Sequence, residues 1–166
     1  STAKLGTITV DGGGSASGTV QTLTLEGTTN VDVATLDASS LSSHLTISGL
    51  TTKAGSNITL GSGNNTLTIA ESDAKIDAVN IDGGDGTDTV VAVSLDNSTT
   101  YRPGTTNVEK LDLDILDAMN GAVTIDGNDS KDVTTIRLRG GASNDQTDSN
   151  ITIEDFDNLA TIEVQG

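Results

Sequence analysis

One stretch of the chain combines aspartate and glycine at a spacing that suits a hard divalent cation. It reads Ile81-Asp-Gly-Gly-Asp-Gly-Thr-Asp-Thr-Val-Val91. Calcium takes about six to eight oxygen ligands, and a glycine-rich turn can direct several main-chain carbonyls inward without steric cost. The candidate ligands are the carboxylates of Asp82, Asp85 and Asp88 and the carbonyls around Gly84 and Gly86. An ordinary Asp/Gly turn between two strands is the alternative.

A second acidic stretch offers oxygen donors at the alternate spacing found in calcium loops. Its candidate ligands are Asp126, Asn128, Asp129 and Asp132. The stretch completes no known motif, so a solvated turn is the competing interpretation. It therefore predicts a possible second metal site, with a weaker basis than the first.

The first stretch also matches the nonapeptide G-G-x-G-x-D-x-U-x, in which U is apolar, at every specified position. The matching residues are Gly83, Gly84, Gly86, Asp88 and Val90. The stretch thus resembles the calcium-binding repeat of the RTX (repeats-in-toxin) family. Residues 76–114 resemble segments of type-I-secreted bacterial S-layer proteins and adhesins. This resemblance implies secretion in an unfolded acidic form and folding when external calcium neutralises the carboxylates. A degenerate copy, Gly61-Ser-Gly-Asn-Asn65, carries Asn65 in the place of the aspartate.

Short strands must position these turns, because a five-residue pattern of apolar, any, apolar, any, glycine recurs along the chain. Its copies begin at Ile8, Leu23, Leu45, Val79, Val123, Ile136 and Ile162. Alternation places each apolar pair on one face, and the glycine permits a turn behind the strand. We expect a single all-β domain over residues 1–166, built as a β-solenoid-like stack of short strands. A Greek-key β-sandwich is the alternative.

Composition excludes several function classes. The chain has 24 acidic and 8 basic residues and a net charge of −16, which disfavours binding to nucleic acid. It lacks an apolar run long enough to span a membrane and contains no cysteine. Its one histidine, His44, has no catalytic partner in sequence, so we expect no enzyme activity. Only two aromatic residues are present, so small aliphatic side chains must fill a thin interior.

These features favour a secreted structural protein at the cell surface that self-assembles into an S-layer, matrix or filament. Terminal strands expose unpaired edges, so the expected contacts are Ile8 and Val10 with Ile162 and Val164 of another copy. A monomeric calcium-dependent adhesin module, with a cell-surface glycan as partner, is the alternative. A further alternative is an ice-binding or carbohydrate-binding solenoid, because Thr-x-Thr triplets occur at Thr7, Thr22 and Thr66. Threonine is also simply a preferred exposed strand residue.

Overall fold

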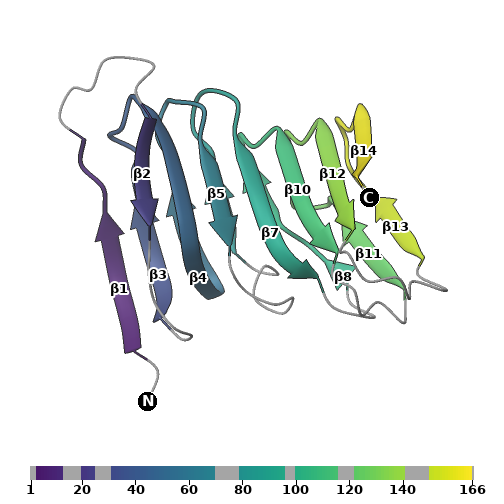
Figure 1. The fold of residues 1–166 in the computed structure, drawn as a ribbon, viewed down its shortest axis with the longest axis horizontal. Coiled ribbons are helices and arrows are strands. Elements are labelled where there is room, and N and C mark those ends of the chain that lie inside the picture. Colours follow the sequence, from purple (N-terminus) through teal and green to yellow (C-terminus); the bar gives the residue numbers. More distant parts are fainter. Residues whose placement is uncertain are drawn as a thin grey trace.

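The chain folds as a parallel β-solenoid in the computed structural model, which describes residues 3–12, 20–24, 31–69, 79–95, 100–115, 122–140 and 150–165. Every strand pair among these residues is parallel (Figure 1). The all-β, solenoid-like prediction is therefore confirmed, and the sandwich alternative is not observed. The described residues include no helix long and apolar enough to cross a membrane.

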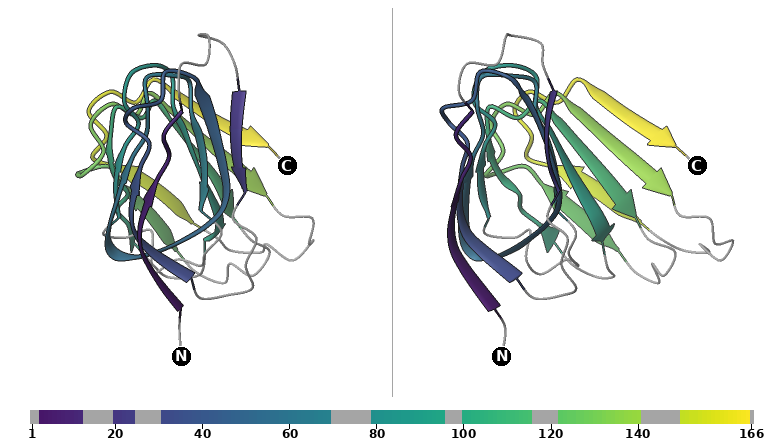
Figure 2. Two further views of the ribbon diagram at one scale, coloured as in Figure 1. Left: turned by 90° about the vertical axis from the view of Figure 1, so that its left-hand side faces the viewer. Right: turned by 60° about the vertical axis from the view of Figure 1, so that its left-hand side comes forward.

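Two walls of strands enclose the core (Figure 2). The front wall contains β2 (Val20–Thr24), the first half of β4 (His44–Thr59), β5 (Thr66–Ile69), β7 (Thr89–Leu95), β10 (Lys110–Ile115), β12 (Thr135–Gly140) and β14 (Thr161–Gln165). The back wall contains β1 (Ala3–Thr9), β3 (Val31–Asp37), the second half of β4, β6 (Asn80–Asp82) and β9 (Gly104–Thr106). A small sheet of β8 (Thr100–Tyr101), β11 (Val123–Asp126) and β13 (Ile151–Glu154) completes the C-terminal coils.

Alternation of inward and outward side chains along the strands produces the core, with register shifts within β4 and β10. Every second side chain of the front wall points inward, and the register aligns these side chains in one column through the stack. The column is Leu23, Ile47, Leu67, Val90, Leu111, Ile136 and Ile162. Its five inner members are at most 1% exposed, whereas Ile162 in the last described coil is 52% exposed. Stacking neighbouring coils therefore buries the apolar face of each strand.

The coil length explains the irregular spacing of the sequence motif. Equivalent front-wall positions fall at Thr46, Thr66, Thr89, Lys110, Thr135 and Thr161, so a coil takes 20 to 26 residues. Some copies of the motif lie in the front wall and others in the back wall or the small sheet. The intervals between copies consequently mix half coils with whole and multiple coils.

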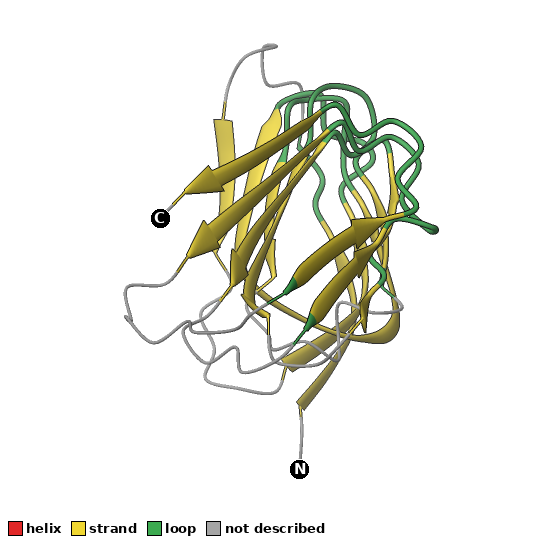
Figure 3. Ribbon diagram, turned by 90° about the vertical axis from the view of Figure 1, so that its right-hand side faces the viewer, coloured by secondary structure: helices red, strands yellow, loops and turns green. Residues whose placement is uncertain are grey.

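Loops at one side of the stack connect the back wall to the front wall (Figure 3). Residues 38–43, 60–65 and 83–88 form three successive six-residue corners, and residues 107–109 form a three-residue corner in the next coil. Backbone hydrogen bonds link these corners, including Ser62 N to Leu41 O at 2.9 Å. The glycine-aspartate stretch Ile81–Val91 thus contains one corner, residues 83–88, of a stacked series.

Candidate cation site at a stacked corner

A ladder of side-chain oxygens runs along the corners, immediately before the front-wall strands. Asn65 Oδ1 accepts a hydrogen bond from Leu45 N at 3.0 Å, and Asp88 Oδ1 accepts one from Asn65 N at 2.6 Å. Glu109 Oε2 in turn accepts one from Asp88 N at 2.7 Å. Each of these side chains therefore accepts a hydrogen bond from a backbone N–H of the preceding coil.

Asn65 uses its other amide atom to bind main-chain carbonyls. Its Nδ2 donates to Gly61 O at 3.2 Å, to Gly63 O at 2.6 Å and to Gly83 O at 3.2 Å. The side chain is 1% exposed, so these bonds form in a region with little competing water. Both the oxygen and the nitrogen of the Asn65 side-chain amide are thus hydrogen-bonded.

Asp88 occupies the equivalent position in the next coil, but an ionised carboxylate has no N–H group to donate. By the register, the carbonyls equivalent to those around Asn65 Nδ2 belong to Gly84, Gly86 and Asn107. Asp88 is 1% exposed, and its Oδ2 is buried without a hydrogen-bond partner among the described residues. A carboxylate oxygen facing carbonyl oxygens is repelled unless a proton or a cation lies between them.

Electrostatics at Asp88 agree with this geometry. The pKa of the Asp88 carboxyl is raised to about 6, chiefly by burial and also by the negative charges of Glu109 and Asp82. Hydrogen bonding from Asn65 opposes the shift. The ionised form of Asp88 is therefore disfavoured in the absence of a bound cation.

The three glycines of the corner allow the coils to approach closely. Gly84 and Gly86 have positive φ angles of 83° and 127°, which side chains rarely permit. A Cβ on Gly86 would lie 2.7 Å from Gly63 O, and one on Gly84 would overlap Gly61 O. Gly83 lies beside Asp88, because its Cβ would be 2.7 Å from Asp88 Oδ2. The glycines that the sequence pattern associates with calcium are therefore also required by stacking.

The other predicted ligands of the first stretch lie farther from the rung. Asp82 Oδ1 accepts hydrogen bonds from Gly84 N at 3.1 Å and from Asn107 Nδ2 at 2.9 Å, whereas Asp85 is exposed at the corner. The carboxylates of Asp82, Asp85 and Asp88 do not gather within 4.8 Å of one another. A cation here would be held by Asp88 with main-chain carbonyls, which fits the donor set expected from Gly84 and Gly86.

The second acidic stretch does not converge as a unit. Asp126 is buried and accepts hydrogen bonds from Asn128 N at 3.0 Å and Arg102 Nε at 2.5 Å, and the Asn128 bond chiefly lowers the Asp126 pKa. Asn128 and Asp129 are exposed, and Asp132 Oδ2 instead accepts from Asn107 N. Within the described ranges, the one group of three acidic side chains with oxygens within 4.8 Å is Asp126, Glu154 and Asp155.

Sequence analysis did not identify Glu109, and it did not predict the contact between Asn65 and Asp88. Glu109 reaches Asp88 N only because its corner is three residues long, and no local motif marks this. Asn65 was found as a degenerate copy of the turn, but its role depends on stacking 23 residues away from Asp88. Comparisons with family models, curated proteins and solved structures found no match to this chain.

Proposed function

We propose that this chain is a secreted, calcium-stabilised structural solenoid that associates end to end into a surface layer, matrix or filament. One observation carries the calcium part of the proposal. Asp88 Oδ2 is buried and unpartnered in a position where the previous coil places an amide NH₂ against three carbonyls. Calcium at this position would replace the missing donor and neutralise the carboxylate.

The chain's charge supports a cation-dependent fold and assembly. A net charge of −16 makes the solenoid repel itself and other copies, and bound divalent cations would reduce that repulsion. Selectivity follows from the ligands: carbonyls in a flexible corner suit calcium, whereas magnesium needs a compact octahedral site and retains its waters. Calcium should therefore stabilise the protein more than magnesium does.

The geometry of the stack supports end-to-end association and changes the expected pairing. β1 and β2 each pair on one side only at the N-terminal end of the described stack, as do β13 and β14 at the other end. Because β14 and β2 both belong to the front wall, continuation of that sheet would join β14 of one copy to β2 of the next. The sequence had suggested β1, with Ile8 and Val10, as the partner of β14.

Thermal unfolding of the wild-type chain and the Asp88→Asn variant tests the calcium proposal. We expect calcium to raise the melting temperature of the wild-type protein, a chelator to lower it, and equimolar magnesium to restore little of the loss. Asp88→Asn should remain folded without calcium and show no calcium response, because its amide reproduces the Asn65 rung. A wild-type protein insensitive to both calcium and chelator would overturn the proposal. Electron microscopy with and without calcium tests the assembly part.

A second candidate function, ice binding, is favoured by the register of the front wall. From β2 to β7, one outward column consists of threonine alone, namely Thr22, Thr46, Thr66 and Thr89. The next outward column is interrupted, because the register shifts between Ile47 and Leu50 of β4. The triplets that begin at Thr22 and Thr66, which are far apart in sequence, thus share one column with rows about 4.8 Å apart. Measurement of thermal hysteresis tests this function, and Thr66→Lys should abolish any activity.

A further inference from the structure

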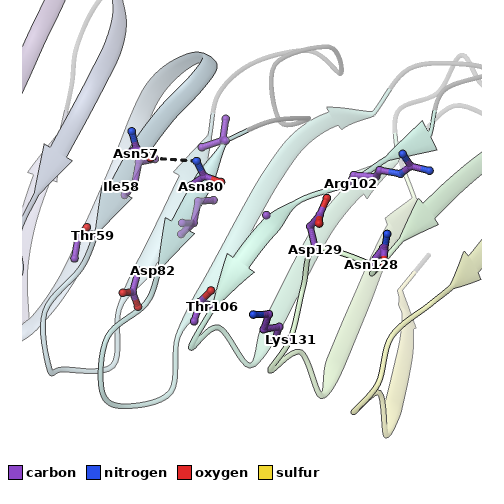
Figure 4. A pocket seen from close by; sticks show the side chains of 13 residues that line it. Asn57, Ile58, Thr59, Asn80, Asp82, Arg102, Thr106, Asn128, Asp129 and Lys131 are labelled. Carbon is purple, nitrogen blue, oxygen red and sulfur yellow. Dashed lines mark hydrogen bonds between the residues drawn. The ribbon is translucent and has the colours of Figure 1, made fainter.

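The back of the solenoid carries a groove of about 710 Å³ that crosses several coils and is lined by both polar and apolar residues (Figure 4). Asn57 of β4, Asn80 of β6 and Gly104 of β9 occupy one outward column of the back wall. Asn128 and Lys131, which follow β11, lie on the far side of the groove. The groove therefore runs along the axis of the stack, across the strands.

Gly104 creates the hollow at the centre of this surface. It is the glycine of a column that otherwise bears amide side chains at Asn57 and Asn80. A Cβ at Gly104 would lie 2.9 Å from Val79 O and 3.3 Å from Asn80 Oδ1. The close packing of β9 on β6 thus requires the glycine, and the missing side chain opens the floor of the groove.

The groove walls present hydrogen-bonding groups that the protein itself does not use. Asn80 Nδ2 donates to Asn57 Oδ1 at 3.1 Å, which fixes both amides and leaves Asn80 Oδ1 facing the groove (Figure 4). Within the part of the chain that the structure describes, the side chains of Asn128, Asp129 and Lys131 form no hydrogen bond or ion pair, and all three are exposed. The groove therefore presents both hydrogen-bond donors and hydrogen-bond acceptors to a ligand.

The surroundings restrict the ligand class. The backbone groups of the β4, β6 and β9 floor are already paired in parallel ladders, so an extended peptide cannot add to them as a strand. The net charge of −16 opposes nucleic acid. Side chains alone must recognise the ligand, and the polar ones in the groove lining offer amides, two carboxylates, a guanidinium and an amine.

We propose that this groove binds a polysaccharide chain lying along the solenoid axis, whose hydroxyl groups bond to Asn80, Asn128 and Asp129. Lys131 would in addition pair with a carboxylate if the sugar is a uronate. Successive coils along the groove are one strand spacing apart, about 4.8 Å, so a linear polymer can contact side chains of several coils. The site is independent of the calcium rung and does not require end-to-end association.

Affinity electrophoresis of the whole protein through gels containing dextran, mannan or alginate tests this inference. Dextran and mannan are neutral, and alginate is a polyuronate. We expect retardation by at least one of the three. Asn80→Ala and Asn128→Ala should each weaken that binding about three- to tenfold, as loss of one or two hydrogen bonds predicts. Asn150→Ala is the matched control, because Asn150 is exposed but lies outside the groove.

Lys131→Gln separates the two classes of sugar. If the ligand is a uronate, this variant should lose binding to alginate; if it is neutral, binding to dextran or mannan should persist. Circular dichroism confirms that each variant is folded. Absence of retardation in all three gels, or equal weakening by Asn150→Ala, would overturn the inference. Capture of an extended peptide that Asn80→Ala abolishes, without sugar binding, would overturn it as well.

Discussion

The backbone N–H of Asn65 donates to Oδ1 of Asp88 at 2.6 Å, so an amide and an acid occupy equivalent rungs of successive coils. The amide satisfies its surroundings with its own NH₂ group, whereas the acid leaves Oδ2 buried and unpartnered. Two nearly isosteric side chains thus differ by a single donor in a stacked position. Protonation of Asp88, cation binding at Asp88 and the Asp88→Asn substitution should each supply what its buried Oδ2 lacks. Their effects on the stability of the protein can therefore be compared directly.

Without calcium, we expect stability attributable to Asp88 to fall as pH rises. The pKa of Asp88 is about 6 in the folded protein and near its ordinary value of 3.8 when unfolded. The folded state therefore binds the proton more tightly, and its contribution is complete below about pH 4 and lost by about pH 6. The loss amounts to up to about 3 kcal/mol in the free energy of unfolding.

Urea denaturation of the wild-type protein and the Asp88→Asn variant from pH 4 to pH 7 separates the contribution of Asp88 from that of other titrating groups. Asp126 and Glu163 have lowered pKa values, so their stabilising contributions are lost as pH falls, in both proteins. The difference between wild type and variant should therefore report Asp88 alone. A difference that stays constant from pH 4 to pH 7 would show that Asp88 does not titrate there. Saturating calcium should flatten the wild-type profile.

Replacing Asn65 with aspartate should create a second acidic rung. Its new Oδ2 would face the carbonyls of Gly61, Gly63 and Gly83 and lie one coil from Asp88. We expect Asn65→Asp to lower the free energy of unfolding by roughly 2–3 kcal/mol at neutral pH, and calcium to recover more stability than in wild type. Melting curves with and without calcium measure this. The control is Asn64→Asp, an exposed neighbour; an equal loss there would contradict the ladder model.

The solenoid could be predicted from the sequence because the alternation of apolar and polar residues along a strand is a local feature. The residues around Leu67 and around Val90 show this alternation. The sequence identified Asp88 because the nonapeptide is contiguous. Coil register is not local: the partner of Asp88 lies 23 residues upstream, and a three-residue corner brings Glu109 within reach. The grouping of Asp126 with Glu154 depends on the pairing of β11 with β13, which no spacing within either strand specifies.

An ion-pair ladder should fix the register of the C-terminal coils on the front wall. Asp112, Arg137 and Glu163 are adjacent in one outward column, so their charges alternate. Arg137 Nε lies 2.6 Å from Glu163 Oε2, and its Nη1 lies 3.5 Å from Asp112 Oδ2. The bond to Glu163 chiefly raises the pKa of Arg137, consistent with a stabilised charged form. Cross-strand pairs of this kind contribute about 0.2–1 kcal/mol each.

Arg137→Met should therefore lower the free energy of unfolding in low salt and lower it by less in 1 M sodium chloride, because salt screens partly exposed pairs. Urea denaturation at both salt concentrations provides the measurement. Lys53→Met is the control, since Lys53 forms no ion pair within the described residues. A loss of the same size at high salt would assign the effect of Arg137 to packing of its aliphatic stem rather than to charge.

Association of copies should depend on the apolar side chains left open at the last described coil. Ile162 and Val164 of β14 continue the columns of inward-facing apolar side chains. They are nevertheless 52% and 77% exposed, because none of the described strands stacks beyond β14. Val164→Asp should reduce the assembled fraction in calcium while leaving the melting temperature of the monomer nearly unchanged. Sedimentation velocity and electron microscopy measure this. Val91→Asp, on the outer side of β7, is the control that adds the same charge away from the end. If both variants assemble like wild type, the association proceeds through another surface, and the pairing of β14 with β2 is wrong.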